Sequence, residues 1–247
     1  MGPFHTTWCC FCWTLYLKLC CYFVIFRLCF YAVECLFFCA VVMLSLNVSA
    51  ALWYPLVRWA IPHLALPHMR VGCVADLDFE KLYELGFRGV CFDKDNTLSI
   101  PYSFELDSSI EKKFNTACSV FGLDFVKVVS NTAGTLDDKN GLWQQQIEED
   151  WGVEVICHKI KKPGCVKAVR HAFGSVKCES VLCVGDRLFS DMVLGNRLGM
   201  GCVLVDPLSW GSEVGVAVRA QSHEHKLLEK WTSKGLSAPL HPLFGES

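Results

Sequence analysis

Between residues 87 and 206, short runs of consecutive apolar residues alternate with longer segments in which apolar residues recur at helical spacing. Consecutive apolar residues are typical of strands that are buried on both faces of a parallel sheet. Alternating strands and helices indicate parallel strands that are joined by right-handed crossovers. We therefore predict an α/β fold, Rossmann-like with a mainly parallel sheet, with strands at 89–92, 125–129, 153–156, 180–184 and 202–205.

Helices are expected in the intervals between these strands. In the first interval, Ile110, Phe114 and Phe121 fall on one face of a helix, and Gly122 is well suited to end it. The expected helices cover 107–121, 142–151, 165–173 and 192–198, and a shorter one at 78–85 precedes the first strand. The core domain is thus expected to span 87–208.

Two regions flank this core. Residues 59–86 are expected to form a linker and an approach helix, because 59–74 shows no sustained periodicity. Residues 209–247 have a mixed pattern and are expected to form a peripheral helix and a tail. Within that tail, we expect His223, Glu224 and His225 to lie on an exposed surface and not at a metal site.

The N-terminal region is the most hydrophobic part of the chain. The uncharged run 35–57 is long enough to span a hydrocarbon core of about 30 Å. Trp53, Tyr54 and Trp59 follow it where an interfacial aromatic belt would lie. We therefore predict that 1–58 is a hydrophobic membrane or targeting segment that precedes the folded domain.

Other readings of this region stay open. A cleaved signal peptide fits less well, because no short apolar core with a small-residue cleavage site stands out. A mitochondrial presequence would carry more Arg and Ser, although no acidic residue occurs before Glu34. Translation from Met43, with 1–42 not translated, is a further alternative.

Composition narrows the choice of partners. The 247 residues carry a formal net charge of −2 with 19% charged residues, which provides no basic field for nucleic acid. The hydrophobic fraction of 52% is high, and its excess lies at the front of the chain. The later cysteines are scattered singly through apolar segments, which suits buried thiols and not a disulfide framework.

The candidate chemistry begins directly after the first strand. Asp93 and Asp95 follow the apolar run 89–92, at the carboxyl end of a strand, which is the usual ligand-binding edge of such a sheet. Asp93 could attack a phosphoryl group and form an aspartyl-phosphate, while Asp95 protonates the leaving oxygen and later deprotonates a water. The concentration of negative charge calls for Mg²⁺, which prefers hard oxygen ligands.

Three further polar clusters follow later strands. Ser130 and Asn131 stand at the end of the second strand, where they are placed to contact a phosphoryl oxygen. Lys162, in a lysine-rich loop before Pro163, is the natural cation for that group. Asp186 is expected as a metal ligand, and Asp191 as a second ligand or as an orienting group.

These clusters resemble those of a known superfamily. The pattern Asp93-x-Asp95-x-Thr97, then Ser130, Lys162 and Gly185-Asp186-x4-Asp191, is similar to that of the haloacid dehalogenase (HAD) phosphatases. More narrowly, the segments 93–97, 129–134, 158–165 and 184–191 look like those of the mitochondrial phosphatidylglycerophosphate phosphatases. The resemblance covers about 46–206, so residues 1–42 depart from it.

The resemblance implies a HAD fold and a specific reaction. The expected activity is Mg²⁺-dependent hydrolysis of phosphatidylglycerophosphate to phosphatidylglycerol, towards cardiolipin, at the inner mitochondrial membrane. Asp93 is then the nucleophile and Asp95 the acid/base. Asp186 would bind Mg²⁺ with Asp93 and the Asp95 carbonyl, and Ser130, Asn131 and Lys162 would contact the phosphoryl group.

Spacing bears on the size of the substrate. The intervals 94–129 and 131–161 hold little more than a crossover helix, a strand and loops, so we expect a capless or minimally capped site. An uncovered site suits a phosphate on a large substrate better than a small metabolite that must be enclosed. The alternatives are a membrane-tethered protein or nucleotide phosphatase, and a membrane-bound interaction protein with a degenerate site.

Overall fold

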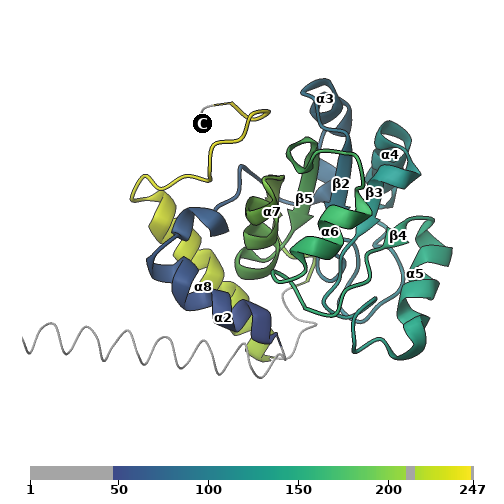
Figure 1. Cartoon of the computed structure of the whole chain (residues 1–247), viewed down its shortest axis with the longest axis horizontal. Helices are drawn as coiled ribbons and strands as arrows, with labels where there is room; N and C mark the ends of the chain where they lie inside the picture. The colour runs from purple at the N-terminus through teal and green to yellow at the C-terminus, as the bar shows by residue number, and fades with distance from the viewer. Residues whose placement is uncertain (1–46, 210–214, 246–247) are drawn as a thin grey trace, which may run out of the picture. The chain divides into compact units, whose positions relative to one another are not determined.

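The computed structural model of the chain describes residues 47–209 and 215–245 (Figure 1). Its centre is a six-stranded sheet in the order β1-β6-β5-β2-β3-β4, and every neighbouring pair is parallel. The strands are β1 (Met69–Val71), β2 (Gly89–Phe92), β3 (Val126–Val128), β4 (Glu154–Val155), β5 (Val181–Gly185) and β6 (Gly201–Val205). The predicted parallel α/β architecture is therefore confirmed.

The α-helices are α2 (Val48–Trp59), α3 (Phe79–Glu84), α4 (Glu111–Phe121), α5 (Leu142–Trp151), α6 (Val166–Ala172), α7 (Val193–Leu198) and α8 (Gly215–Thr232). Short helical turns are η1 (Pro62–Ala65), η2 (Val74–Asp76), η3 (Leu123–Phe125), η4 (Lys139–Gly141), η5 (Cys178–Ser180) and the π-helical turn η6 (Leu188–Met192).

The order of the strands fixes where the helices lie. The chain passes from β2 to β3 and β4 in one direction across the sheet, and from β4 through β5 to β6 in the other. Right-handed crossovers therefore put α4 and α5 on one face and α6 and α7 on the opposite face. In Figure 1, α6 and α7 lie in front of the strands, whereas α4 and α5 lie on the β3 and β4 side.

This reversal creates a switch point between β2 and β5. These two strands are hydrogen-bonded neighbours, and the chain leaves them in opposite directions. Ligands of open α/β sheets bind in the crevice at the carboxyl ends of such strands. All residues of β2, β5 and β6 are buried, so apolar packing on both faces holds this crevice in place.

The helix α2 belongs to the folded domain. Its buried residues Ala50, Ala51, Tyr54 and Val57 pack inward, and the Tyr54 ring lies 4.9 Å from that of Phe189. The Tyr54 side chain is fully buried and its hydroxyl lies 3.0 Å from Nε2 of His223. The expectation that Tyr54 belongs to an interfacial aromatic belt is therefore wrong.

The membrane prediction falls largely on residues 1–46, which are outside the described residues. Among the helices within 47–209 and 215–245, none combines the length and the apolar character needed to cross a bilayer. The cysteines in this part of the chain are all free thiols.

The sequence analysis missed the edge strand β1. It read 59–74 as a linker, whereas Met69–Val71 pairs with Val203–Val205 of β6. A three-residue strand at an edge shows only a partly buried pattern, so its sequence carries too little periodicity to be recognised.

Helix α7 supplies a test of the packing. Gly195 lies in the middle of α7, where Gly→Ala would normally favour the helix by about 1 kcal/mol. A Cβ there would lie 2.5 Å from the Cys202 sulfur and 2.8 Å from the Cys183 Cβ. We expect Gly195→Ala to lower the free energy of unfolding by about 1–3 kcal/mol, measured by urea denaturation, because the core is overpacked.

The matched control is Ser119→Ala on the exposed face of α4, which should change the free energy of unfolding by less than about 0.5 kcal/mol. A Gly195→Ala protein that is more stable than the wild type would contradict the close approach of α7 to the sheet.

Candidate active site

Asp93 stands at the switch point of the sheet. It follows β2 directly, and its backbone N–H donates to the Val184 carbonyl on β5 at 2.8 Å. Its carboxylate oxygen Oδ1 accepts hydrogen bonds from the Lys94 backbone N–H at 2.7 Å and from Lys162 Nζ at 2.5 Å. Asp93 is buried, and these hydrogen bonds fix the position of its carboxylate.

Lys162 comes to Asp93 from the loop after β4. Its ammonium lies 2.5 Å from Asp93 Oδ1 and 2.7 Å from Asp191 Oδ1, and its side chain is only 1% exposed. Asn131 accepts a hydrogen bond from the Lys162 backbone N–H at 2.8 Å. His158 ties the same loop down, since its two ring nitrogens lie 2.9 Å from the carbonyl oxygens of Ser130 and Ile160.

Asp191 lies in the turn that follows β5, and this turn is wider than an α-helical turn. The turn η6 has π-helical geometry, a feature often found at functional sites. A Cβ at position 185 would lie 2.6 Å from the Asp191 Cβ, so only glycine fits at Gly185. Asp191 Oδ2 accepts hydrogen bonds from the Arg187 N–H at 3.1 Å and Ser190 Oγ at 3.2 Å.

Asp186 completes a cluster of three buried carboxylates. Asp93, Asp186 and Asp191 each offer one oxygen, and these atoms lie within 4.8 Å of one another. Oδ2 of Asp186 accepts a 2.6 Å hydrogen bond from Gln221, whereas its buried Oδ1 has no hydrogen-bond partner. A buried carboxylate oxygen without a partner is costly, and a divalent cation would satisfy it.

The protonation of the cluster reflects this crowding. Burial raises the pKa of Asp93 to about 7 even though Lys162 pulls it down. Burial, reinforced by Asp93 and Asp191, raises the pKa of Asp186 well above its usual range. Burial disfavours the ammonium of Lys162, but Asp191 and Asp93 outweigh it, so the pKa of Lys162 is raised. Lys162 contacts only two of the three carboxylates, so a cation at Asp186 would offset the remaining negative charge.

Asp95 lies apart from this cluster. Its Oδ1 accepts from Lys94 Nζ at 2.8 Å, and its Oδ2 accepts from Thr132 Oγ1 at 3.2 Å. Thr132 Oγ1 is also 2.8 Å from Ser130 Oγ, which connects Asp95 to the end of β3. The Asp95 side chain is 24% exposed, so it faces the open side of the site. The structure thus brings all seven predicted residues to one edge, with Asp95 on its outer side.

The sequence analysis missed the contribution of α8. Gln221 of this helix donates to Asp186, and Glu224 accepts from the Arg187 guanidinium at 2.8 Å and from the Leu188 N–H at 2.6 Å. Glu224 is buried and His223 contacts Tyr54, so the prediction of an exposed surface at 223–225 is wrong. A helix that approaches from the far end of the chain leaves no local signal in the sequence.

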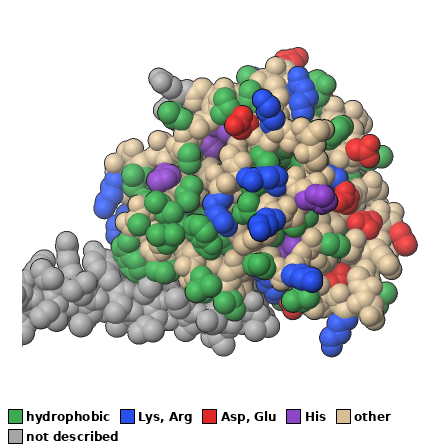
Figure 2. Space-filling model, in the orientation of Figure 1, with side chains coloured by type: hydrophobic (Ala, Val, Ile, Leu, Met, Phe, Trp, Pro, Cys, Tyr) green, Lys and Arg blue, Asp and Glu red, His purple; other side chains and the backbone are tan. Residues whose placement is uncertain are grey.

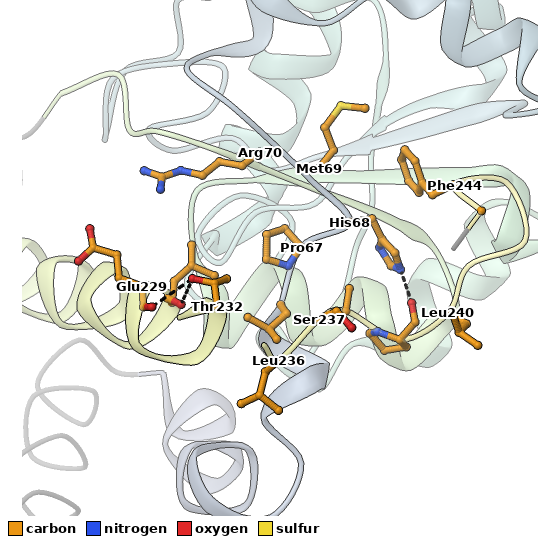
Figure 3. A pocket seen from close by; sticks show the side chains of 15 residues that line it. Pro67, His68, Met69, Arg70, Glu229, Thr232, Leu236, Ser237, Leu240 and Phe244 are labelled. Carbon is orange, nitrogen blue, oxygen red and sulfur yellow. Dashed lines mark hydrogen bonds between the residues drawn. The ribbon is translucent and has the colours of Figure 1, made fainter. Parts of the chain in front are cut away.

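A separate cavity of about 330 Å³ lies along the edge strand β1 (Figure 3). Residues 66–70, the end of α8 and the C-terminal segment 236–245 line it, and most of these residues are apolar. It borders the amino end of β1, whereas Asp93 and Asp186 follow the carboxyl ends of their strands. None of the three carboxylates lines it, so the candidate site is the switch point and not this cavity.

The sequence of the folded domain matches a known protein family. Residues 56–209 match the family described as mitochondrial PGP phosphatase, and this range contains every predicted site residue. The chain belongs to this family. No solved structure matches the chain.

Related proteins extend the family across plants and yeast. The chain is 38% identical over 183 residues to "Phosphatidylglycerophosphate phosphatase 1, chloroplastic/mitochondrial" of Arabidopsis thaliana, covering 73% of this chain and 52% of that protein. It is 35% identical to the chloroplastic phosphatase 1 of Chlamydomonas reinhardtii, covering 73% and 67%. It is 30% identical to "Phosphatidylglycerophosphatase GEP4, mitochondrial" of Saccharomyces cerevisiae, covering 56% and 76%. The chain thus spans about half the length of the Arabidopsis relative.

The carboxylate cluster predicts a stability that depends on metal and pH together. The folded protein retains protons on Asp93 and Asp186 that the unfolded chain has released, so without metal its stability falls as the pH rises from 3.8 towards about 7. Mg²⁺ competes with these protons. We expect stabilisation of about 2.7 kcal/mol at 100 times Kd near pH 8, and a smaller effect at pH 5.5.

Thermal melting of the full chain with Mg²⁺ or with a chelator measures this effect. Asp186→Asn should melt higher than the wild type without metal and should lose the Mg²⁺ shift. Equal shifts at both pH values, retained in Asp186→Asn, would contradict a metal site at this cluster.

Proposed function

We propose that the protein is a Mg²⁺-dependent phosphatidylglycerophosphate phosphatase that acts through an aspartyl-phosphate. The observation that carries this proposal is the position of Asp93, buried at the switch point between Lys162 and two further carboxylates. The names of the relatives supply the substrate, and the match of residues 56–209 supports its transfer to this chain.

Asp93 is the nucleophile. The hydrogen bonds described for its side chain end on Oδ1, which leaves Oδ2 to attack phosphorus. A bond forms between Asp93 and phosphorus while the bond from phosphorus to the alcohol oxygen breaks. Lys162 offsets the charge of the carboxylate and of the phosphoryl oxygens, and Ser130 lies where its hydroxyl can donate to them.

Asp95 moves the protons. In the first step it gives its proton to the leaving alcohol oxygen, and in the second it takes a proton from the water that attacks the aspartyl-phosphate. That attack releases inorganic phosphate and restores the Asp93 carboxylate. The partial exposure of Asp95 supports this role, because the leaving group and the water both enter from the open side.

Asp93 and Asp186 would hold Mg²⁺ together with the Asp95 carbonyl, and Asp191 would orient the metal site. The unpartnered Oδ1 of Asp186 and the hard oxygen donors of the cluster suit this ion. When bound, Mg²⁺ supplies positive charge that stabilises the transferring phosphoryl group. Asp191 already accepts hydrogen bonds on both oxygens, from Lys162 and from the turn η6, which favours its orienting role.

The site supports a large substrate at a membrane. Between Asp93 and Lys162, the described residues form α4, β3, α5, β4 and short connections, which supports the proposal of a capless or minimally capped site. Helix α2 presents a second apolar face outward, formed by Val48, Leu52, Leu56 and Trp59, which are 40–72% exposed. Figure 2 shows hydrophobic side chains gathered over this part of the molecule, with Lys and Arg side chains beside them.

The outward face formed by these four residues is the α2 stripe, and the first turn of α2 lies next to Gly164, in the loop that carries Lys162. A Cβ on Gly164 would lie 2.7 Å from Ser49 Oγ of α2 and 2.4 Å from the Cγ2 of exposed Ile160. We infer that the stripe rests in the interface of an organelle membrane and holds the site at the headgroups. The names of the relatives point to a mitochondrion or a chloroplast, and we propose the mitochondrial inner membrane.

Two substitutions test the chemistry. Asp93→Asn should abolish phosphate release, because the covalent route is lost. Asp95→Asn should slow turnover by about 10²- to 10⁴-fold, the usual scale for a positioned acid/base. The assay compares phosphatidylglycerophosphate in mixed micelles with a phosphopeptide and a nucleotide monophosphate. Wild-type rates in either variant would refute the assignment, and a preference for the soluble substrates would favour a protein or nucleotide phosphatase.

The α2 stripe gives a second test. The double variant Leu52→Glu and Leu56→Glu should lower turnover of vesicle-borne substrate by about tenfold or more. It removes two leucines that the proposal buries in the membrane interface. Turnover of a short-chain, water-soluble substrate should stay at the wild-type level. Leu123→Glu, at an equally exposed leucine before β3, is the control. Parallel losses on both substrates would contradict a membrane role for the stripe.

A further inference from the structure

A second buried lysine, Lys94, directly follows Asp93 in the chain. Lys94 is 2% exposed, and its ammonium donates to Asp95 Oδ1 at 2.8 Å. Its backbone is fixed as well, since its carbonyl accepts hydrogen bonds from the N–H groups of Leu98 at 2.9 Å and Ser99 at 3.0 Å. This ammonium is therefore held in one place. It has no role in the mechanism proposed for Asp93, Asp95 and Lys162.

The two lysines differ in how far their charge is balanced. Lys162 contacts two buried carboxylates, whereas the ion pair of Lys94 is with Asp95 alone, whose side chain is 24% exposed. An ammonium has three donors, and a buried one that is only partly paired carries a desolvation penalty. A second anion beside Lys94 would reduce that penalty.

The space for such an anion is present. A groove of about 190 Å³ lies beside Asp95, lined by Lys94, Tyr102, Phe104, Thr132, Ala133 and Trp143. Three of these residues also bond to the Asp95 carboxylate: the Lys94 ammonium, the Thr132 hydroxyl and, at 3.4 Å, the Tyr102 N–H. The groove is therefore lined in part by the residues that hydrogen-bond to Asp95.

Aromatic residues form much of the groove lining. Tyr102 has a left-handed backbone with φ of 66°, an uncommon conformation for a bulky residue, and is 75% exposed. Trp143, at the start of α5, is 41% exposed. These faces offer apolar cover for carbon atoms, whereas Lys94 is the one cation among the six lining residues.

We propose that this groove is the leaving-group subsite, and that Lys94 binds a second anionic group, a phosphodiester, which a short alcohol spacer connects to the phosphate being removed. The inference rests on the proposed function, because Asp95 marks the leaving oxygen only if it protonates it. In that case the spacer emerges between Thr132 and Tyr102, and its far end meets the Lys94 ammonium. Selectivity for a phosphate next to a diester is then built into the residue between the two catalytic aspartates.

Water-soluble substrates isolate this effect from membrane binding. The full chain is assayed in detergent with glycerol 3-phosphate, with a glycerol that carries a methyl phosphodiester at one end and a phosphomonoester at the other, and with dihexanoyl phosphatidylglycerophosphate. We expect the wild type to prefer both diester-bearing substrates. Lys94→Met should reduce the ratio of their kcat/KM to that of glycerol 3-phosphate by about 10- to 100-fold, the scale of a hydrogen bond to a charged group.

Two further variants complete the test. Trp143→Ala, at a half-exposed position where misfolding is not expected, should reduce the same ratio in the same direction. Lys112→Met removes an exposed lysine from α4 and should leave the ratio unchanged. If Lys94→Met and Trp143→Ala lower kcat/KM equally for all three substrates, Lys94 only positions Asp95 and the subsite is refuted.

The outcomes separate the subsite from the proposed function. A wild type that hydrolyses vesicle-borne phosphatidylglycerophosphate but shows no preference for a diester among the soluble substrates overturns the subsite and leaves the function standing. Absence of phosphate release from every substrate overturns the proposed function, and the subsite with it.

Discussion

The catalytic edge of this protein depends on an excess of negative charge that is held away from water. Asp93, Asp186 and Asp191 converge at the switch point of the sheet, and Lys162 is the cation that contacts two of them. Such an arrangement opposes folding unless the carboxylates take up protons or a cation. The raised pKa values of Asp93 and Asp186 reflect the cost of burying these negative charges, and a bound metal ion would offset this cost. The same feature that costs stability thus makes the cluster of Asp93, Asp186 and Asp191 a candidate metal site, where the proposed Mg²⁺ would bind.

The surroundings of the cluster are built to hold this charge in place. Glycine at position 185 and the π-helical turn bring Asp191 back onto Lys162, and Gln221 of α8 fixes one oxygen of Asp186. Glu224, one helical turn further on, binds Arg187 beside the cluster. Helix α8 thereby connects the C-terminal region to Asp186 and Arg187. Through the contact of Tyr54 with His223, it also connects α2 to these residues.

The sequence was informative where a site residue follows a buried strand. Asp93, Ser130 and Asp186 each stand directly after an apolar run, and parallel strands place their carboxyl ends together, so their meeting could be predicted. The roles of Gln221 and Glu224 could not be predicted, because their contacts join residues 35 or more positions apart and follow no period. The strand β1 was missed for a related reason, since its two half-buried residues and exposed Arg70 gain their strand character from pairing with β6. The uncharged run 35–57 and its flanking aromatic residues predict a membrane segment, but this pattern cannot show that Tyr54 of α2 packs against Phe189 in the folded domain.

The proposed capless site would place a particular demand on selectivity. The groove beside Asp95 is lined by residues of two short segments of the chain, 94–104 and 132–143. Any discrimination must then come from residues adjacent to the catalytic motifs themselves. Lys162 contacts two carboxylates and keeps one of its three donors for the proposed phosphoryl group, while Lys94 shares a single, partly exposed carboxylate and lines the groove. With the proposed subsite, the unequal pairing of these two lysines would divide the site into a phosphoryl side and a leaving-group side, and the domain would contact both ends of its substrate.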